Sequence, residues 1–86
     1  MHSILIAKTF QKELRKLQND LQDRIREALK KLEENPFDSR PGADIKLLVN
    51  TEPKKHRLRV GDYRIIYYVE GNIVRVIDVF HRGKGY

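Results

Sequence analysis

Residues 55–64, Lys-His-Arg-Leu-Arg-Val-Gly-Asp-Tyr-Arg, constrain the fold more than any other part of the chain. Side chains along a strand alternate between the two faces of a sheet. This alternation gives two sets, with Lys55, Arg57 and Arg59 on one face and His56, Leu58 and Val60 on the other. The Gly-Asp pair at 61–62 fits a primed two-residue turn, in which glycine takes a positive φ angle. We therefore expect a hairpin with one cationic and one apolar face.

The register of this hairpin places like charges opposite each other. The turn pairs Val60 with Tyr63, Leu58 with Ile65, and Arg59 with Arg64. Apolar side chains match on one face, so the register is self-consistent. Two arginines directly opposite each other cost stability. An anion-binding protein would use such a face, whereas a purely structural sheet would avoid it.

A second turn at Gly71-Asn72 predicts a third strand, Ile73–Phe80, that is apolar on both faces like a central strand. The same counting pairs Val69 with Val74, Tyr67 with Val76, and Arg64 with Val79. It places His81 on the cationic face. It also places Asp78 on the apolar face, which implies either a bulge in the strand or an open face at that point.

The first half of the chain predicts a strand followed by helices. Ser3–Ala7 is a short β-type segment, and Thr9 is a candidate helix cap. Apolar residues then recur every three or four positions from residue 10 to 34. The periodicity permits one long helix. We favour two helices in a hairpin, because Gln18-Asn19-Asp20 is poor in helix formers and Asp20 with Asp23 resembles a new N-terminal cap.

The helical pattern ends before Pro36, because the residue before a proline resists the α conformation. Ile45–Val49 is either a short strand or a buried turn. The order β-α-α-β-β-β indicates an α+β fold, with an N-terminal helical hairpin on a small antiparallel-meander sheet. We expect residues 1–86 to form a single domain.

Composition narrows the range of functions. The 86 residues carry a formal net charge of +6, which favours a polyanionic partner. The chain has no cysteine, and its three histidines lack zinc-site spacing, so we expect no metal and no cofactor. No apolar run approaches the ~20 residues that cross a bilayer. We therefore expect a cytoplasmic protein with no membrane partner.

Cations from separate segments are expected on one surface. They are Lys55, Arg57, Arg59, Arg64 and His81, with Arg82 and Tyr86 close by. Guanidinium groups suit a phosphodiester, because each offers a rigid fork of donors that stays charged. Fixed cations also stabilise the extra negative charge of a pentacovalent phosphorane. RNA supplies its own nucleophile in the 2′-OH, and a tyrosine can stack on an unpaired base.

The helical segment, residues 55–67, residues 76–82 and Tyr86 together resemble the RelE branch of the RelE/ParE toxin superfamily. The likeness covers essentially the whole chain and is most specific at Leu-Arg-Val-Gly-Asp-Tyr-Arg, 58–64. It implies a RelE-like toxin of a type II toxin–antitoxin pair. Such toxins cut mRNA in the ribosomal A site, without a metal, by 2′-OH attack on the adjacent phosphate. A RelB-type antitoxin would wrap and neutralise the toxin.

The resemblance also implies roles for particular residues. Lys55 and Arg57 would stabilise the attacking oxygen and the charged phosphate, and Arg64 would bind the scissile phosphate. Arg82 would assist the leaving 5′-oxygen. Tyr86 would stack on the substrate or take part in proton transfer. On the same surface we expect Lys54, Arg59 and His81 to contribute to RNA binding.

Other interpretations remain open at this point. The basic run 54–57 is also typical of a solvated edge strand, in which lysines discourage aggregation between sheets. A ParE-like toxin shares the expected fold but poisons DNA gyrase and lacks the catalytic set. A non-catalytic RNA- or protein-binding module would need only the positive face.

Overall fold

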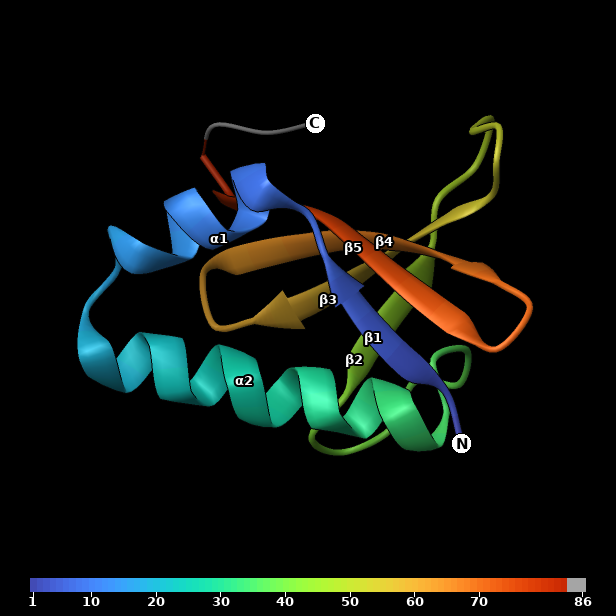
Figure 1. Ribbon diagram of the computed structural model, residues 1–86, viewed down its shortest axis with the longest axis horizontal. Coiled ribbons are helices and arrows are strands. Elements are labelled where there is room, and N and C mark those ends of the chain that lie inside the picture. Colours follow the sequence, from blue (N-terminus) through green and yellow to red (C-terminus); the bar gives the residue numbers. More distant parts are fainter. Residues whose placement is uncertain (84–86) are drawn as a thin grey trace.

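The computed structural model describes residues 1–83 and contains two helices and five strands within them (Figure 1). In chain order these are β1 (Ser3–Ile6), α1 (Lys8–Arg15), α2 (Asn19–Glu34), β2 (Asp44–Leu47), β3 (Lys55–Val60), β4 (Tyr63–Glu70) and β5 (Ile73–His81). The predicted α+β class and the helical hairpin are confirmed. The segment 45–49, which the sequence left open, contributes the strand β2.

The five strands form one sheet in the order β1-β5-β4-β3-β2. Strands β2 to β5 make the expected antiparallel meander, and β1 joins its far edge parallel to β5. The β3–β4 register is the predicted one, with Leu58 opposite Ile65 and Arg59 opposite Arg64. Gly61 has a φ angle of +58°, as the predicted turn requires.

The two helix starts differ in detail from the sequence prediction. Ala7, not Thr9, is the residue that precedes α1, and among the described residues no side chain caps that end. The Ala7 N–H donates to Val76 O at 3.0 Å, so the strand pairing continues to the first residue of the helix. Thr9 thus falls inside the first turn, and its predicted capping role is wrong. Helix α2 begins at Asn19, with Asp20 in its first turn and Gln18 at the cap position.

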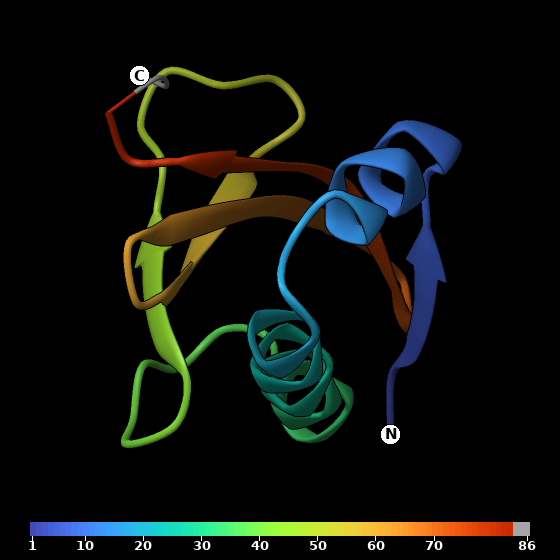
Figure 2. The ribbon, with the colours of Figure 1, turned by 90° about the vertical axis from the view of Figure 1, so that its left-hand side faces the viewer.

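The core lies between the helical hairpin and one face of the sheet. Phe10 of α1, Ile25 and Leu32 of α2, and Leu58 and Ile65 of the sheet are all fully buried. Figure 2 shows α2 beneath the curved sheet, with the 48–54 loop and the end of β5 on the side away from it. The other sheet face therefore has no helix over it in the described part of the chain.

Aromatic rings extend the core toward the loop that follows α2. The Tyr67 hydroxyl donates to Pro36 O at 2.7 Å, and burial raises the pKa of Tyr67, so this hydroxyl stays protonated. His56 stacks on Tyr67 with ring centroids 5.4 Å apart, and Phe37 contacts His56 edge-to-face with ring centroids 5.7 Å apart. Burial lowers the pKa of His56 below its usual 6.5, so its ring is neutral at pH 7.

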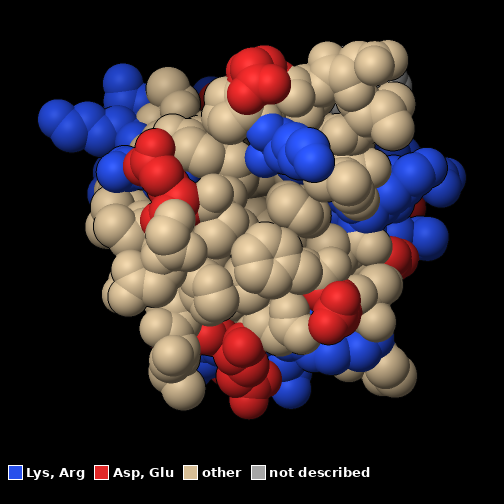
Figure 3. Space-filling model, turned by 90° about the vertical axis from the view of Figure 1, so that its right-hand side faces the viewer, with Lys and Arg blue, Asp and Glu red and all other residues tan. Residues whose placement is uncertain are grey.

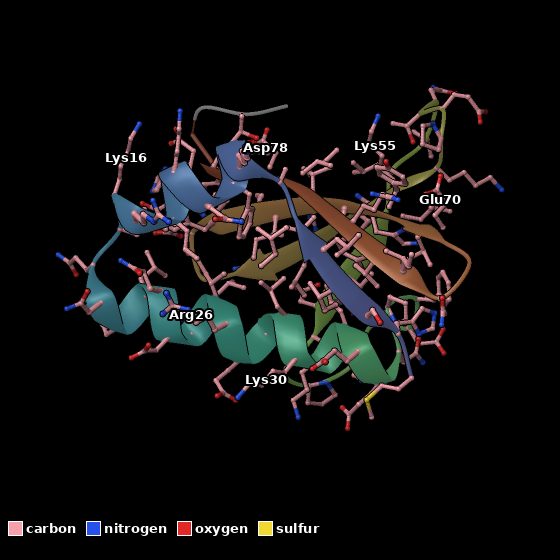
Figure 4. All side chains as sticks on the ribbon, viewed as in Figure 1. Lys16, Arg26, Lys30, Lys55, Glu70 and Asp78 are labelled. Carbon is pink, nitrogen blue, oxygen red and sulfur yellow. The ribbon has the colours of Figure 1, made fainter. Side chains whose placement is uncertain are left out.

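A bulge in β5 resolves the conflict around Asp78. The β4–β5 register shifts between Ile66 and Tyr67, so Asp78 lies opposite Ile66 on the open face instead of beside Ile65. The exposed Asp78 carboxylate therefore avoids the apolar core, where an unpaired charge would be costly (Figure 4). One residue, Ile77, is left without a partner in the ladder, as in other bulges.

The bulge overturns two predictions about the end of β5. Arg64 lies opposite Phe80 and not opposite Val79. His81 lies opposite Tyr63 and faces the helices, so its predicted place on the cationic face is wrong. The physical reason is the same for both. One extra residue on a strand sends every later side chain to the other face.

Within residues 1–83, no helix has the length and apolar character that a membrane span requires.

Candidate functional site

The open face of the sheet carries three rows of paired side chains. From β2 to β5, the rows are Asp44–Arg59–Arg64–Phe80, Lys46–Arg57–Ile66–Asp78, and, from β3 onward, Lys55–Tyr68–Arg75. Residues paired across strands share a face, so these rows alone bring most of the predicted cations together. The basic character of the face follows from the alternation first seen in β3.

Arg57, Arg64 and Arg82 line one hollow of about 470 Å³ at the end of this face. They come from β3, β4 and the residues just after β5. Leu48, Phe80 and Gly83 complete its lining. The predicted convergence of these three arginines is therefore confirmed as geometry, and the hollow is large enough for a phosphate and part of a nucleotide.

Arg57 has a buried hydrogen-bond donor that is unpaired within residues 1–83. Its Nε is buried, and no acceptor within residues 1–83 lies in hydrogen-bond range. Its cross-strand neighbours are Lys46 on β2, which is another cation, and the apolar Ile66 on β4. Buried donors are nearly always paired in folded proteins. An unpaired guanidinium N–H beside a hollow is suited to an anionic oxygen that enters from solution.

Arg59 and Arg64 lie directly opposite each other, and the turn between them accommodates both. The Gly61 carbonyl oxygen accepts from Arg59 Nε at 3.4 Å and from Arg64 Nη1 at 3.1 Å. Arg64 Nη1 also donates to Tyr63 O at 3.1 Å. Arg59 Nη1 lies 4.0 Å from the Asp44 carboxylate. Arg59 is thus partly neutralised, whereas Arg64 is held by carbonyl groups and keeps its charge for a ligand.

Arg82 is held by the same turn from the other side. Its backbone N–H donates to Asp62 O at 2.8 Å. Its Nε lies 3.7 Å from the Asp62 carboxylate, and both side chains are more than half exposed. The backbone hydrogen bond fixes where the chain leaves β5, and the Arg82 side chain pairs with Asp62 and also lines the hollow.

The remaining predicted site residues are more dispersed. Lys55 begins β3 beside the 48–54 loop, on the same face but outside the lining of the hollow (Figure 4). Lys54 is exposed in that loop. His81 packs edge-on against Tyr63 on the helix-facing side, and its Nδ1 accepts from the Gly83 N–H at 3.3 Å. Tyr86 lies outside the described residues, so its predicted place beside the arginines stays a prediction.

Several residues around the site were not singled out from sequence. Lys46 extends the Arg57 row, and Leu48 and Phe80 line the hollow. The Lys46 signal was the alternation of 44–47, which became readable only once that segment was known to be a strand. Unbroken alternation from Asp78 would place Phe80 on the helix-facing side, and the bulge instead brings it opposite Arg64 on the open face.

The basic charge is not spread evenly over the molecule. Figure 3 shows the side that carries the β4–β5 turn, where uncharged residues fill the middle and charged side chains lie around the rim.

Within the described residues, no three His, Cys, Asp or Glu side chains are grouped as a metal site would require. The charged groups among the described residues that line the hollow are the guanidinium groups of Arg57, Arg64 and Arg82.

These features define a small basic α+β domain whose open sheet face carries three converging arginines. A family model described as the ParE toxin of the type II toxin–antitoxin system parDE matches residues 4–86. The chain therefore belongs to this family, within the RelE/ParE toxin superfamily, and is a toxin of a type II toxin–antitoxin system. A comparison with curated proteins by sequence finds no match.

Solved structures of toxin–antitoxin complexes are similar to this chain. A chain of the archaeal RelE–RelB complex from Pyrococcus horikoshii OT3 is 29% identical with a TM-score of 0.82, and the match covers 98% of both chains. The RelB–RelE complex from Methanococcus jannaschii gives 30% identity, a TM-score of 0.74, and coverage of 92% of this chain and 91% of that one. The RelBE2 complex from Mycobacterium tuberculosis shares the fold, at 24% identity, a TM-score of 0.76, and coverage of 94% and 98%.

Proposed function

We propose that this toxin is a ribosome-dependent endoribonuclease that cuts mRNA in the A site without a metal. The observation that carries the proposal is the meeting of Arg57, Arg64 and Arg82 at one hollow. Three guanidinium groups from separate segments carry more positive charge than one phosphodiester carries negative charge. They therefore favour a transition state that is more negative than the substrate. The likeness to chains of the RelE–RelB complexes from Pyrococcus horikoshii OT3 and Methanococcus jannaschii supports the same proposal.

In the proposed reaction, the RNA 2′-oxygen attacks the adjacent phosphorus. A bond forms between phosphorus and O2′, the bond to O5′ breaks, and the 2′-OH proton leaves while O5′ gains one. Arg57 and Arg64, which line the hollow, stabilise the phosphorane oxygens, and Arg82 from the same lining assists O5′, as the family resemblance implies. The products are a cyclic phosphate on one fragment and a 5′-hydroxyl on the other.

The family resemblance implies further roles for Lys55 and Tyr86. Lys55 stabilises the attacking oxygen as its proton leaves, as the family resemblance implies. Tyr86, outside the described residues, stacks on a base or carries a proton. The buried Tyr67 takes no part, because its raised pKa and its bond to Pro36 keep its hydroxyl protonated and engaged.

The proposed partners are the ribosome, mRNA and a RelB-type antitoxin, all in the cytoplasm. The net charge of +6 suits polyanionic RNA and an acidic antitoxin alike. Two of the similar chains were crystallised with RelB, which supports an antitoxin of that type. If an adjacent gene encodes a small acidic protein, co-expression of that protein with this toxin should yield a stable complex.

The direct test uses purified protein, programmed ribosomes and end-labelled mRNA. Wild type should cut at the A-site codon, and Arg64→Ala should reduce the rate about 10²–10³-fold, as the loss of one oxyanion donor does. Ribosome binding should change far less, because other cations share it. Arg75→Ala is the matched control, since Arg75 is on the same face but pairs with Glu70 at 2.8 Å and lies outside the hollow. Identical cleavage by wild type and an Arg64→Ala, Arg82→Ala double variant would refute the nuclease.

A gyrase-directed toxin is the second candidate, because the family model that matches is described as ParE. A supercoiling assay with purified gyrase separates the two, since a nuclease should leave supercoiling unchanged. A non-catalytic RNA-binding module would instead bind single strands with a log–log salt slope of about −0.7 for each neutralised phosphate and form no product.

A further inference from the structure

A single two-residue turn contacts three of the arginines on the open face. The Gly61 carbonyl accepts from Arg59 and Arg64. The Asp62 carbonyl accepts from the Arg82 backbone, and the Asp62 carboxylate pairs with the Arg82 side chain. The β3–β4 turn therefore organises cations from both of its own strands and from the end of β5.

Each of these contacts uses only part of a guanidinium group. Asp62 meets Arg82 through Nε, so the two terminal nitrogens are left to reach an acceptor in the hollow. Within residues 1–83, the hydrogen bonds that hold the Arg64 side chain come from Nη1. An arginine side chain that is already ordered loses less conformational freedom when a substrate binds. Within residues 1–83, the turn thus holds Arg64 and Arg82 while part of each guanidinium group is left for a ligand.

We propose that Asp62 is a positioning residue for RNA cleavage, which aims the Arg82 guanidinium at the leaving oxygen. This inference rests on the proposed nuclease function. Asp62 itself does not line the hollow, so it acts through Arg82 and not on the RNA. Its carboxylate is the acidic group that ion-pairs with Arg82 among residues 1–83.

The sign of the effect distinguishes positioning from simple electrostatics. Removing a carboxylate makes the face more positive, so RNA binding should tighten or stay the same. If charge alone mattered, cleavage would also become faster. If Asp62 orients Arg82, cleavage becomes slower even though binding is not weakened, because small misplacements of a catalytic group lower the rate strongly.

The experiment measures single-turnover cleavage on programmed ribosomes at several toxin concentrations. Asp62→Ala should lower the maximal rate on the order of tenfold and leave the half-saturating concentration equal or lower. Asp62→Asn, which suits the turn and keeps an acceptor, should recover part of the rate. Glu70→Ala removes a carboxylate from a comparable exposed pair with Arg75, outside the hollow, and should cleave like wild type.

A double-mutant cycle then tests whether Asp62 acts through Arg82. In an Arg82→Ala background, Asp62→Ala should have no further effect on the maximal rate. The same loss in both backgrounds would overturn the proposal, and so would a wild-type rate for Asp62→Ala. Thermal unfolding of each variant separates a loss of fold from a loss of positioning.

An independent readout distinguishes failure of this inference from failure of the nuclease. In ¹⁵N NMR of the free toxin, the Arg82 Nε–H signal should show restricted motion in wild type and greater motion in Asp62→Ala, with Arg75 unchanged. If the toxin does not cut RNA but this change occurs, Asp62 still orders Arg82 and only the proposed reaction is wrong. If Arg82 is equally mobile in both proteins, the positioning role is wrong whatever the activity.

Discussion

Arg57→Met should stabilise the fold and abolish the proposed RNA cleavage. The buried Arg57 Nε has no acceptor in the described part of the chain, and an unsatisfied buried donor costs about 1–3 kcal/mol. Methionine retains an unbranched apolar stem where Arg57 crosses Ile66, which is fully buried. The substitution also removes a cation opposite Lys46, a further gain of about 0.2–1 kcal/mol.

Methionine cannot replace the hydration and packing of the rest of the guanidinium group, and this loss offsets part of the two gains. The expected net increase in the free energy of unfolding is therefore about 1–2 kcal/mol. For a domain of this size, each kcal/mol raises the melting temperature by about 4–8 °C. Urea unfolding followed by circular dichroism measures the change directly, and an unchanged m-value would show that the unfolded state is not altered.

Arg59→Met is the matched control. Arg59 is on the same strand and face but already has Gly61 O and Asp44 as partners, and half of its side chain is exposed. Its substitution should change stability by no more than about 0.5 kcal/mol. The reasoning fails if Arg57→Met is less stable than wild type by 1 kcal/mol or more while Arg59→Met is neutral. That result would mean that the Arg57 guanidinium is already satisfied in the free protein.

Three further predictions concern the core and the turns. Tyr67→Phe leaves Pro36 O without its buried donor, so urea unfolding should report a loss of about 1–3 kcal/mol. Because burial lowers the pKa of His56 in the fold, the unfolded chain is protonated first as the pH falls. The contribution of neutral His56 to the free energy of unfolding should therefore be fully present above about pH 6.5 and be lost as the pH falls below it. His56→Phe should flatten that part of the pH–stability curve. Gly61→Ala and Gly71→Ala both force alanine into a positive φ, at +58° and +62°, and should each cost about 1–2 kcal/mol, but only the former should also slow cleavage.

Much of the fold follows from short-range patterns in the sequence. The alternation at 55–60 and the turn at 61–62 predict the β3–β4 hairpin with its correct register. The helical periodicity with its weak centre predicts the break between α1 and α2. These predictions succeed because a strand period and a turn type are local properties. The parallel pairing of β1 with β5 depends on residues ~70 apart, and no local pattern specified it.

The candidate site was harder to predict because a single residue decides which side chains share its face. The sequence showed that Asp78 conflicts with an unbroken register, but not at which position the strand would absorb the extra residue. The bulge brings Phe80 to the hollow and moves His81 to the helix-facing side. Arg82 reaches the hollow because the same shift sends alternate residues there. Conflicts of this kind in a pattern therefore mark the places where a site can depart from simple counting.

The like charges of Arg59 and Arg64 illustrate how the sheet sustains an arrangement that is locally unfavourable. Cross-strand repulsion between them is predictable from sequence, and its compensation is not, because the compensating groups are backbone carbonyls. Gly61 O and Tyr63 O accept from these arginines, and a carbonyl reduces the repulsion without cancelling the charge. A carboxylate in the same place would neutralise Arg64 and compete with a phosphate. A tight turn whose carbonyls face the cations therefore allows the chain to fold and still present an uncompensated positive charge to an anion.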